Sequence, residues 1–119
     1  MAQLNELIHQ PQRLQIMATL AALDANTQLG FTYVRDQLGL TDGNLGAHLR
    51  KLEDAQYIAV TKAFVGRKPQ TYVQATKEGR RAFVEHLAAL EAILRTATVS
   101  ITNTDQPSDD TLRLEQPVG

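Results

Sequence analysis

The sequence predicts a mainly α-helical domain that carries one β-hairpin, an α+β fold. Three observations predict it. Apolar residues recur at helical spacing on both sides of residues 57–75, and those residues are rich in β-branched and aromatic side chains. The chain has 119 residues, 43% of them hydrophobic, which fits one compact domain. We expect the order helix, helix, helix, hairpin, helix over residues 1–96, and a flexible polar tail rich in Thr, Ser, Asp, Gln and Pro over 97–119.

Apolar residues in the first 23 positions follow helical spacing. The stripe begins at Leu4 and continues beyond Pro11 to Leu23. Pro11 suits the first turn of a helix, because the missing N–H has no helical partner there. In residues 12–23 apolar side chains occupy almost every face, so we expect this helix to be covered on more than one side, in part by a second subunit.

Two further helical patterns follow the polar connection 24–30. The first has apolar positions over residues 33–40 and is two to three turns long. Thr41 or Asp42 is placed to cap a helix over residues 42–55, and we interpret Asp42 as a cap, since a carboxylate stabilises a helix N-terminus but repels phosphate. This helix has one buried stripe: Leu45, Leu49 and Leu52.

Two strands and a last helix complete the pattern. Residues 57–64 and 71–75 have strand character and are joined by the loop 65–70, which contains Gly66 and Pro69. Thr76 then caps the last helix. Its apolar positions fall at a spacing of four, three and four residues: Phe83, Leu87, Leu90 and Leu94.

Composition argues against several classes of function. The chain has no Cys, and its three His lie on separate predicted helices without paired ligand spacing, so we expect no disulfide, no metal and no cofactor. No Gly-Lys-Ser/Thr motif follows the glycines, and no nucleophile can be paired with a base, so we expect no enzyme. No apolar stretch approaches the ~18 residues of a membrane span, and the first residues show no charged region followed by an apolar block, so we expect no targeting segment. We expect a cytoplasmic protein without membrane partners.

Charge is concentrated in the middle of the chain. With 12 Lys or Arg against 13 Asp or Glu the chain is nearly neutral, yet residues 43–81 hold eight cations and three acids. Such a distribution indicates a local polyanion-binding face. When the helix over 42–55 is unrolled at about 100° per residue with its leucines inward, six residues point outward: Gly43, Asn44, Ala47, Arg50, Lys51 and Asp54.

These outward residues suit a DNA groove. Small residues admit close approach, Asn44 has the donor and acceptor that read adenine, and Arg50 and Lys51 reach guanine or phosphate. Arg67 and Lys68 on the loop, with Lys62 on its stem, are placed to contact phosphates or the minor groove. The sequence therefore predicts a helix in the major groove beside a basic hairpin.

The motifs also resemble a known family. The segments Leu40 to Glu53, Gly66 to Thr71 and Thr76 to Arg80, together with Tyr57, look like the small winged helix-turn-helix transcriptional regulators related to the MarR and ArsR groups, over about residues 5–94. The resemblance implies a repressor-type regulator that binds duplex DNA as a homodimer. It implies recognition-helix contacts from Thr41, Asn44, Ala47, His48, Arg50 and Lys51, and wing contacts from Arg67 and Lys68. The family usually has Gly where this chain has Gln56, so we expect that turn to differ slightly.

A homodimer is expected because the first helix is apolar on more faces than a small monomer covers. The dimerisation residues that we predict are Leu7, Ile16, Leu20, Phe83, Leu87, Leu90 and Leu94. Such a dimer reads a palindromic operator whose half-sites lie one helical turn, about 34–36 Å, apart.

Three questions stay open in the sequence. His48 either contacts DNA or packs against the hairpin. A winged-helix protein-interaction module is the alternative function, although the outward face of the 42–55 helix carries the cations that such a module lacks. A small-molecule effector has little room inside one subunit, so any effector site is expected between subunits.

Overall fold

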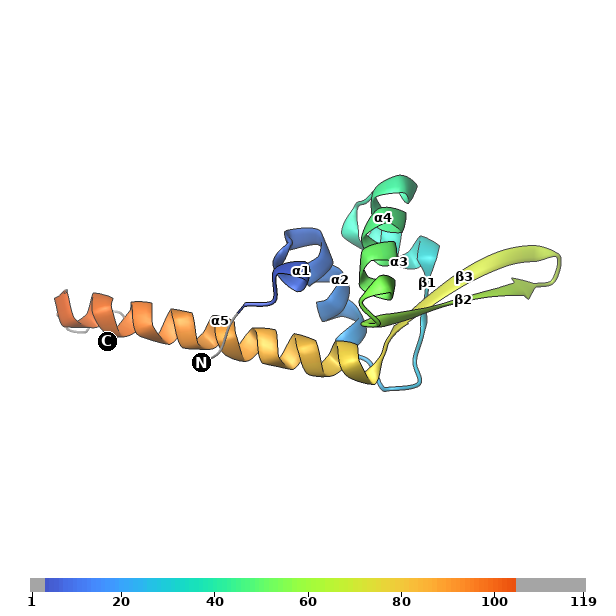
Figure 1. The fold of residues 1–119 in the computed structure, drawn as a ribbon. Coiled ribbons are helices and arrows are strands. Elements are labelled where there is room, and N and C mark those ends of the chain that lie inside the picture. Colours follow the sequence, from blue (N-terminus) through green and yellow to red (C-terminus); the bar gives the residue numbers. More distant parts are fainter. Residues whose placement is uncertain (1–3, 105–119) are drawn as a thin grey trace, which may run out of the picture.

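The computed structural model describes residues 4–104, which form helices and one small sheet (Figure 1). The elements are α1 (Glu6–His9), α2 (Pro11–Ala21), β1 (Leu29–Gly30), α3 (Phe31–Leu38), α4 (Asp42–Asp54), β2 (Ile58–Val65), β3 (Lys68–Ala75) and α5 (Lys77–Thr104). The predicted α+β class and the order of helices and hairpin are confirmed. Strand β1 was not predicted.

The first apolar stripe forms two helices that meet at Gln10. Asn5 caps α1, because its side-chain oxygen accepts a hydrogen bond from the backbone N–H of Ile8. Gln10 has an extended backbone and caps α2 by accepting from the N–H of Arg13. Pro11 occupies the first turn of α2, as the sequence predicts.

The sheet is antiparallel, with the strand order β1-β3-β2. Only two residues of β1 pair with β3, Leu29 with Val73 and Gly30 with Tyr72. Two residues are too short for a periodic pattern, so no local signal marks β1 as a strand. Tertiary packing brings this segment, which directly precedes α3, against the hairpin.

The hairpin turn is tighter than the sequence predicts. Instead of the six-residue loop 65–70, a two-residue turn at Gly66 and Arg67 joins the strands, and Val65 pairs with Lys68. Gly66 has a φ of 67° and Arg67 has no positive φ, which is the pattern of a type II′ turn. Pro69 lies within β3 opposite Phe64, where its missing N–H fits a pair without ladder hydrogen bonds.

The core lies between α2, α4 and the base of the hairpin. Its fully buried side chains include Ile8, Ile16, Met17, Leu20, Val34, Leu45, Leu52 and Val73. Ile16 and Leu20 were predicted at a subunit interface, but they are 0% and 1% exposed within one subunit. That assignment is wrong, because the other helices and β3 of the same chain cover α2 and leave these two side chains no free surface.

Helix α5 is longer than predicted and extends beyond the body of the domain (Figure 1). The expected boundary between domain and tail at 96/97 is wrong, because α5 continues to Thr104; residues 105–119 of the predicted tail lie outside the described residues. Of the predicted apolar positions, Phe83 and Leu90 are half-buried, whereas Leu87 is 40% and Leu94 is 62% exposed. Among the described residues, no helix is long and apolar enough to span a bilayer.

Where α4 leads into β2, a residue with a left-handed backbone ends the helix. Gln56 has a φ of 66°. The N–H of Tyr57 donates to the carbonyl of Leu52 at 2.9 Å, and the N–H of Gln56 donates to that of Glu53 at 2.8 Å. This pair of bonds is the Schellman arrangement that usually places Gly at the left-handed position. The expectation that the turn differs is wrong: Gln56 adopts the backbone that Gly would.

Helix α5 starts against the same turn. The Thr76 hydroxyl donates to the carbonyl of Gln56 at 2.6 Å and accepts from the N–H of Gly79 at 2.9 Å, which confirms Thr76 as the cap. The N–H of Thr76 donates to the carbonyl of Tyr57 at 3.0 Å. A Cβ at position 79 would overlap the Tyr57 carbonyl oxygen, so only Gly fits here.

Candidate nucleic-acid interface

Helix α4 presents one face to the core and the other to solvent. Leu45, Leu49 and Leu52 are buried, as predicted from their spacing. All six residues that were expected to face outward are exposed: Gly43, Asn44, Ala47, Arg50, Lys51 and Asp54. The helix therefore offers a continuous polar and cationic surface opposite its leucine stripe.

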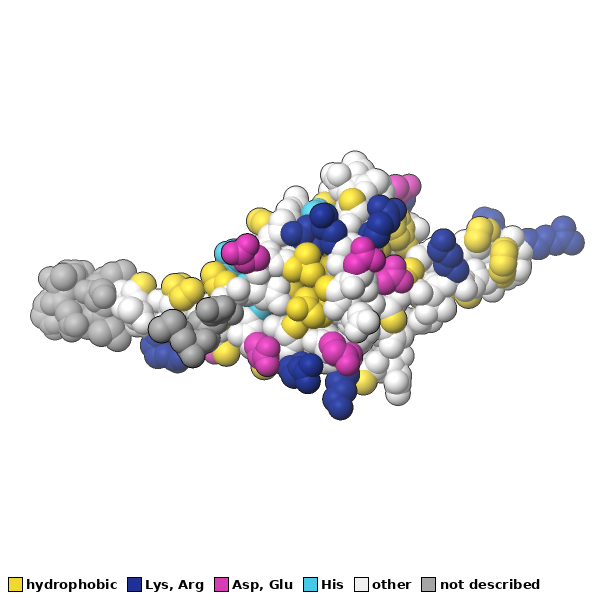
Figure 2. All heavy atoms as spheres, in the orientation of Figure 1, with side chains coloured by type: hydrophobic (Ala, Val, Ile, Leu, Met, Phe, Trp, Pro, Cys, Tyr) yellow, Lys and Arg dark blue, Asp and Glu magenta, His cyan; other side chains and the backbone are white. Residues whose placement is uncertain are grey.

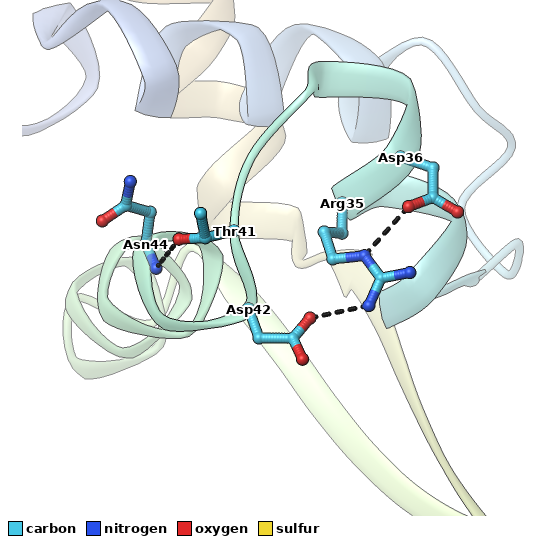
Figure 3. A network of polar contacts seen from close by, with 5 residues as sticks. All are labelled: Arg35, Asp36, Thr41, Asp42 and Asn44. Atoms are coloured by element: carbon cyan, nitrogen blue, oxygen red, sulfur yellow. Dashed lines mark hydrogen bonds and ion pairs between the residues drawn. The ribbon is translucent and has the colours of Figure 1, made fainter.

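The start of α4 is held by a cap and an ion-pair network (Figure 3). The Thr41 side-chain oxygen accepts from the backbone N–H of Asn44 at 3.1 Å, which leaves the Thr41 hydroxyl proton free to donate. The side chain of Asn44 points away from the helix (Figure 3). Thr41, and not Asp42, is thus the cap. Asp42 instead accepts from Arg35 of α3 at 2.7 Å.

Arg35 carries a second ion pair within α3. Its Nε donates to Asp36 at 2.9 Å, and hydrogen bonds to Asp36 and then Asp42 raise the pKa of Arg35 further above its ordinary value. Arg35 offsets the negative charge of Asp42, which an approaching phosphate would otherwise meet at the start of α4. The Arg35–Asp42 pair also links α3 to the first turn of α4.

His48 is half-buried beside an arginine that sequence reasoning missed. Arg13 of α2 donates from Nη1 to His48 Nδ1 at 3.3 Å and from Nε to the carbonyl of Leu7 at 2.6 Å. Because arginine only donates, Nδ1 of His48 is the acceptor and the proton lies on Nε2. Burial, then the charges of Arg13 and Lys51, lower the pKa of His48. One feature of the sequence could have drawn attention to Arg13: it is the sole Lys or Arg before Arg35.

A shallow groove of about 340 Å³ separates α4 from the hairpin. Gly46, Arg50 and Glu53 line it from α4, Val60 and Lys62 from β2, and Thr71 from β3. Arg50 and Lys62 thus lie on opposite sides of one depression. The predicted contacts of the helix and of the hairpin stem belong to one concave surface.

The hairpin carries its cations to a protruding end. Lys62, Arg67 and Lys68 are all exposed. In the described part of the chain every ion pair involves Arg35, so these side chains and those of Arg50 and Lys51 pair with no acid there. Figure 2 shows Lys and Arg side chains over the α4 side of the body and again at the end of the hairpin.

The remaining cations of the basic segment have other positions. Lys77, Arg80 and Arg81 lie on α5. Arg80 donates to the carbonyls of Ala21, Leu23 and Asp24, and so binds the C-terminal end of α2. The eight cations of residues 43–81 therefore divide into five on α4 and the hairpin and three on α5.

Two of the histidines meet in the structure, although their helices are distant in sequence. His86 is 1% exposed, and its Nδ1 accepts from the N–H of Asn5 at 3.0 Å. Its Nε2 therefore carries the proton and faces Nδ1 of His9 at 3.3 Å. Burial, then the neighbouring His9, lower the pKa of His86. Residues 4–104 contain no group of three side chains that would hold a metal ion.

Comparison with known proteins identifies the fold. Residues 12–94 match the family described as winged helix DNA-binding domain. An uncharacterised protein of Methanocaldococcus jannaschii is 35% identical over 75 residues, which are 63% of this chain and 78% of that protein. A transcriptional regulator homologue from Pyrococcus horikoshii superposes with a TM-score of 0.71 at 29% identity, over 78% of this chain and 89% of that one.

More distant structures share the fold alone. A PadR family transcriptional regulator from Eggerthella lenta superposes with a TM-score of 0.58 at 21% identity, over 84% of this chain and 92% of that one. Its likeness shows that the fold recurs in a chain with little sequence in common.

Proposed function

The chain belongs to the family of winged helix DNA-binding domains, and from that premise we propose that it binds a palindromic operator as a homodimer and represses transcription. The family is one of DNA-binding transcriptional regulators and not of enzymes. What we propose beyond the family's DNA binding is that the protein is a homodimer, that its operator is palindromic and that it represses transcription.

The exposed face of α4 carries the proposal. It combines unpaired cations with small residues, and a groove connects it to the hairpin. With α4 in the major groove, Asn44 and Ala47 discriminate bases while Arg50 and Lys51 contact guanine or phosphate. Thr41 and His48 have a free hydroxyl proton and an Nε2 proton to donate to phosphates. Lys62, Arg67 and Lys68 follow the backbone or the minor groove.

Exposed apolar residues on α5 support the homodimer. Leu87, Ile93 and Leu94 are 40%, 51% and 62% exposed, and α5 extends beyond the other described elements (Figure 1). A second copy of α5 packed on this stripe would remove these side chains from water, at roughly 25 cal/mol per Å² of apolar surface. A symmetric dimer places two α4 helices in successive major grooves, and its binding over a promoter excludes the polymerase.

The first experiment measures fluorescence anisotropy on a duplex from the region upstream of the gene and on a scrambled duplex. At physiological salt we expect about 10³-fold tighter binding to the upstream duplex. Asn44→Ala should lower this preference, whereas Arg50→Ala should weaken binding to both duplexes. Arg81→Ala is the matched control, since Arg81 is an exposed cation on α5. Absence of binding even at low salt would contradict the proposal and favour a protein-interaction module.

A second experiment tests the dimer by light scattering. Leu94→Glu should convert the dimer to a monomer, because dimer formation would bury the introduced carboxylate and its desolvation is costly. Val84→Glu is the control: Val84 is 63% exposed, nearly as much as Leu94, but lies on the polar side of α5 with Glu91 and Arg95. A wild-type protein that is monomeric at micromolar concentration would contradict the proposed dimer.

A further inference from the structure

The end of the hairpin is apolar as well as basic. Phe64 is 72% exposed, which makes it the most exposed of the six aromatic side chains of the chain. It lies one residue before the end of β2, and Pro69 of β3 is its cross-strand partner. Directly opposite side chains are close neighbours, so Phe64 and Pro69 form one small apolar surface, the apolar tip.

The apolar tip lies on the side of the hairpin that faces α4. Alternate residues of a strand share a face, so Phe64 is on the same face as Lys62, Val60 and Ile58. Ile58 is buried in the core, and Val60 and Lys62 line the groove against α4. Val65, by contrast, belongs to the opposite face, together with its partner Lys68.

The reach of the hairpin matches the spacing of DNA grooves. Phe64 lies six residues beyond Ile58, which at ~3.4 Å per residue is about 20 Å along the strand. Half a helical turn of DNA, the step from a major groove to the next minor groove, is about 17 Å. The strand is thus long enough for the apolar tip to reach the neighbouring minor groove when α4 lies in a major groove.

Cations surround the apolar tip. Arg67 lies in the turn beside it, and Lys62 lies one step back on the same face. Lys68 adds a third positive charge on the other face, and none of the three pairs with an acid within residues 4–104. A hydrophobic centre with a basic rim complements a minor groove, whose walls are phosphates and whose floor and sides are sugar and base edges.

We propose that Phe64, supported by Pro69, inserts into the minor groove next to the α4 site and contacts sugar and base edges there. Apolar side chains of this kind act as wedges between base steps in proteins that bind the minor groove. Flexible pyrimidine–purine steps accept such a wedge at the lowest cost, so Phe64 adds a preference for those steps. This inference rests on the proposed DNA binding.

A tryptophan reporter tests the insertion directly. The chain contains no Trp, so Phe64→Trp provides a single fluorophore at the tip. In a titration with the upstream duplex, the emission of this introduced indole should be quenched in parallel with the rise in anisotropy of the labelled DNA. Unchanged indole emission in samples where anisotropy reports saturation would overturn the inference and leave the proposed function intact.

Affinities across a salt series give a second, independent readout. Phe64→Ala should weaken binding about tenfold, the usual scale for an aromatic contact to bases, without changing the slope of log affinity against log salt. Arg67→Ala should reduce that slope by about one. Val65→Ala is the matched control, because Val65 is 58% exposed but faces the other way, and it should bind like the wild type.

The outcomes separate the inference from its premise. If the wild-type protein binds none of the duplexes, the proposed function itself fails. If it binds and Phe64→Ala equals the wild type, the wedge alone is wrong. If Phe64→Ala changes the oligomeric state by light scattering and leaves DNA affinity unchanged, the apolar tip contacts a second copy of the chain, which also overturns the inference.

Discussion

The residues at the two ends of strand β2 have different surroundings. At its base, Tyr57 is enclosed by the end of α4, the start of α5 and Asn5, whose side-chain amide donates to the Tyr57 hydroxyl at 2.9 Å. At its tip, Phe64 and Arg67 are exposed and contact little beyond the hairpin itself. At the base β2 adjoins three other segments of the chain, whereas at the tip it adjoins only β3.

This difference separates residues that support the fold from residues that are free to bind. At the base, the hydroxyl and N–H of Thr76 bond to backbone groups of Gln56, Tyr57 and Gly79, and Gly79 lies against the Tyr57 carbonyl, so a change there displaces two helices and a strand. At the tip, side chains can change without moving any other element. We therefore expect stability to depend on the base and DNA affinity on the tip.

The largest effect is expected from Gly79→Ala. The added Cβ would overlap the carbonyl oxygen of Tyr57, and a backbone atom cannot give way as a flexible side chain would. We expect a loss of about 3 kcal/mol in the free energy of unfolding, measured by urea denaturation. Gly43→Ala is the control, because a Cβ there meets nothing within 4 Å. Equal stability of both variants would refute the close contact.

The next effect is a dependence on pH near the base. The pKa of His86 is lowered from its ordinary value of 6.5, mainly by burial and then by His9. Below pH 6.5 His86 takes up a proton in the unfolded chain but resists protonation in the folded one. The free energy of unfolding therefore has its full value above this pH and falls as the pH decreases. Protonation of Nδ1 would also remove the acceptor of the Asn5 N–H.

A pair of variants isolates this effect. His86→Gln retains an acceptor and should flatten the decline in the free energy of unfolding between neutral and mildly acidic pH. The titratable neighbours His9 and Glu6 on α1 and Glu85 on α5 remain in that variant. His48→Gln serves for comparison, because the pKa of His48 is lowered too. An equally steep decline in His86→Gln and wild type would exclude His86 as the cause.

A smaller effect, of opposite sign, is expected from Gln56→Gly. A left-handed backbone costs a residue with a Cβ roughly 1–2 kcal/mol, and the φ of Gln56 is 66°. Removing the Cβ should raise the free energy of unfolding by about 1 kcal/mol, after allowance for the greater freedom of glycine in the unfolded chain. A thermal melt measures the difference, and a lower midpoint for the variant would show that the Gln56 side chain contributes more than its backbone costs.

The smallest changes in stability are expected at the tip. Phe64→Ala and Arg67→Ala remove exposed side chains outside the core, so the free energy of unfolding should remain within about 0.5 kcal/mol of the wild type. The same denaturation series measures both. A loss comparable to that of Gly79→Ala would mean that the tip supports the fold, and the contrast between the two ends of β2 would disappear.

Local patterns predicted most of the elements. Leucine spacing fixed the inner and outer faces of α4, because helical geometry alone decides which residues share a side. Pro11 and Thr76 marked helix starts through groups that act within one turn. Pro69 misled the prediction of the turn, since the sequence does not show that its position in the ladder needs no N–H donor.

Contacts between distant segments were beyond local patterns. The partner of His48 is Arg13, 35 residues away, and that of His86 is Asn5, 81 residues away. Likewise, the apolar surface of α2 that suggested a subunit interface at Ile16 and Leu20 is covered by its own chain. Side-chain type shows that a residue needs a partner, but not which one the packing supplies.

The sequence by itself determined which surface of this protein is basic and which helix carries it, since both depend on spacing within a single element. Only the tertiary structure decided that Asp42 is paired with Arg35 and that α4 and the hairpin share one groove. It also decided that Phe64 lies on the face of the hairpin that is turned toward α4. The reason is physical: helical and strand periods act over a few residues, whereas burial and hydrogen bonding between elements are settled only when the whole chain packs.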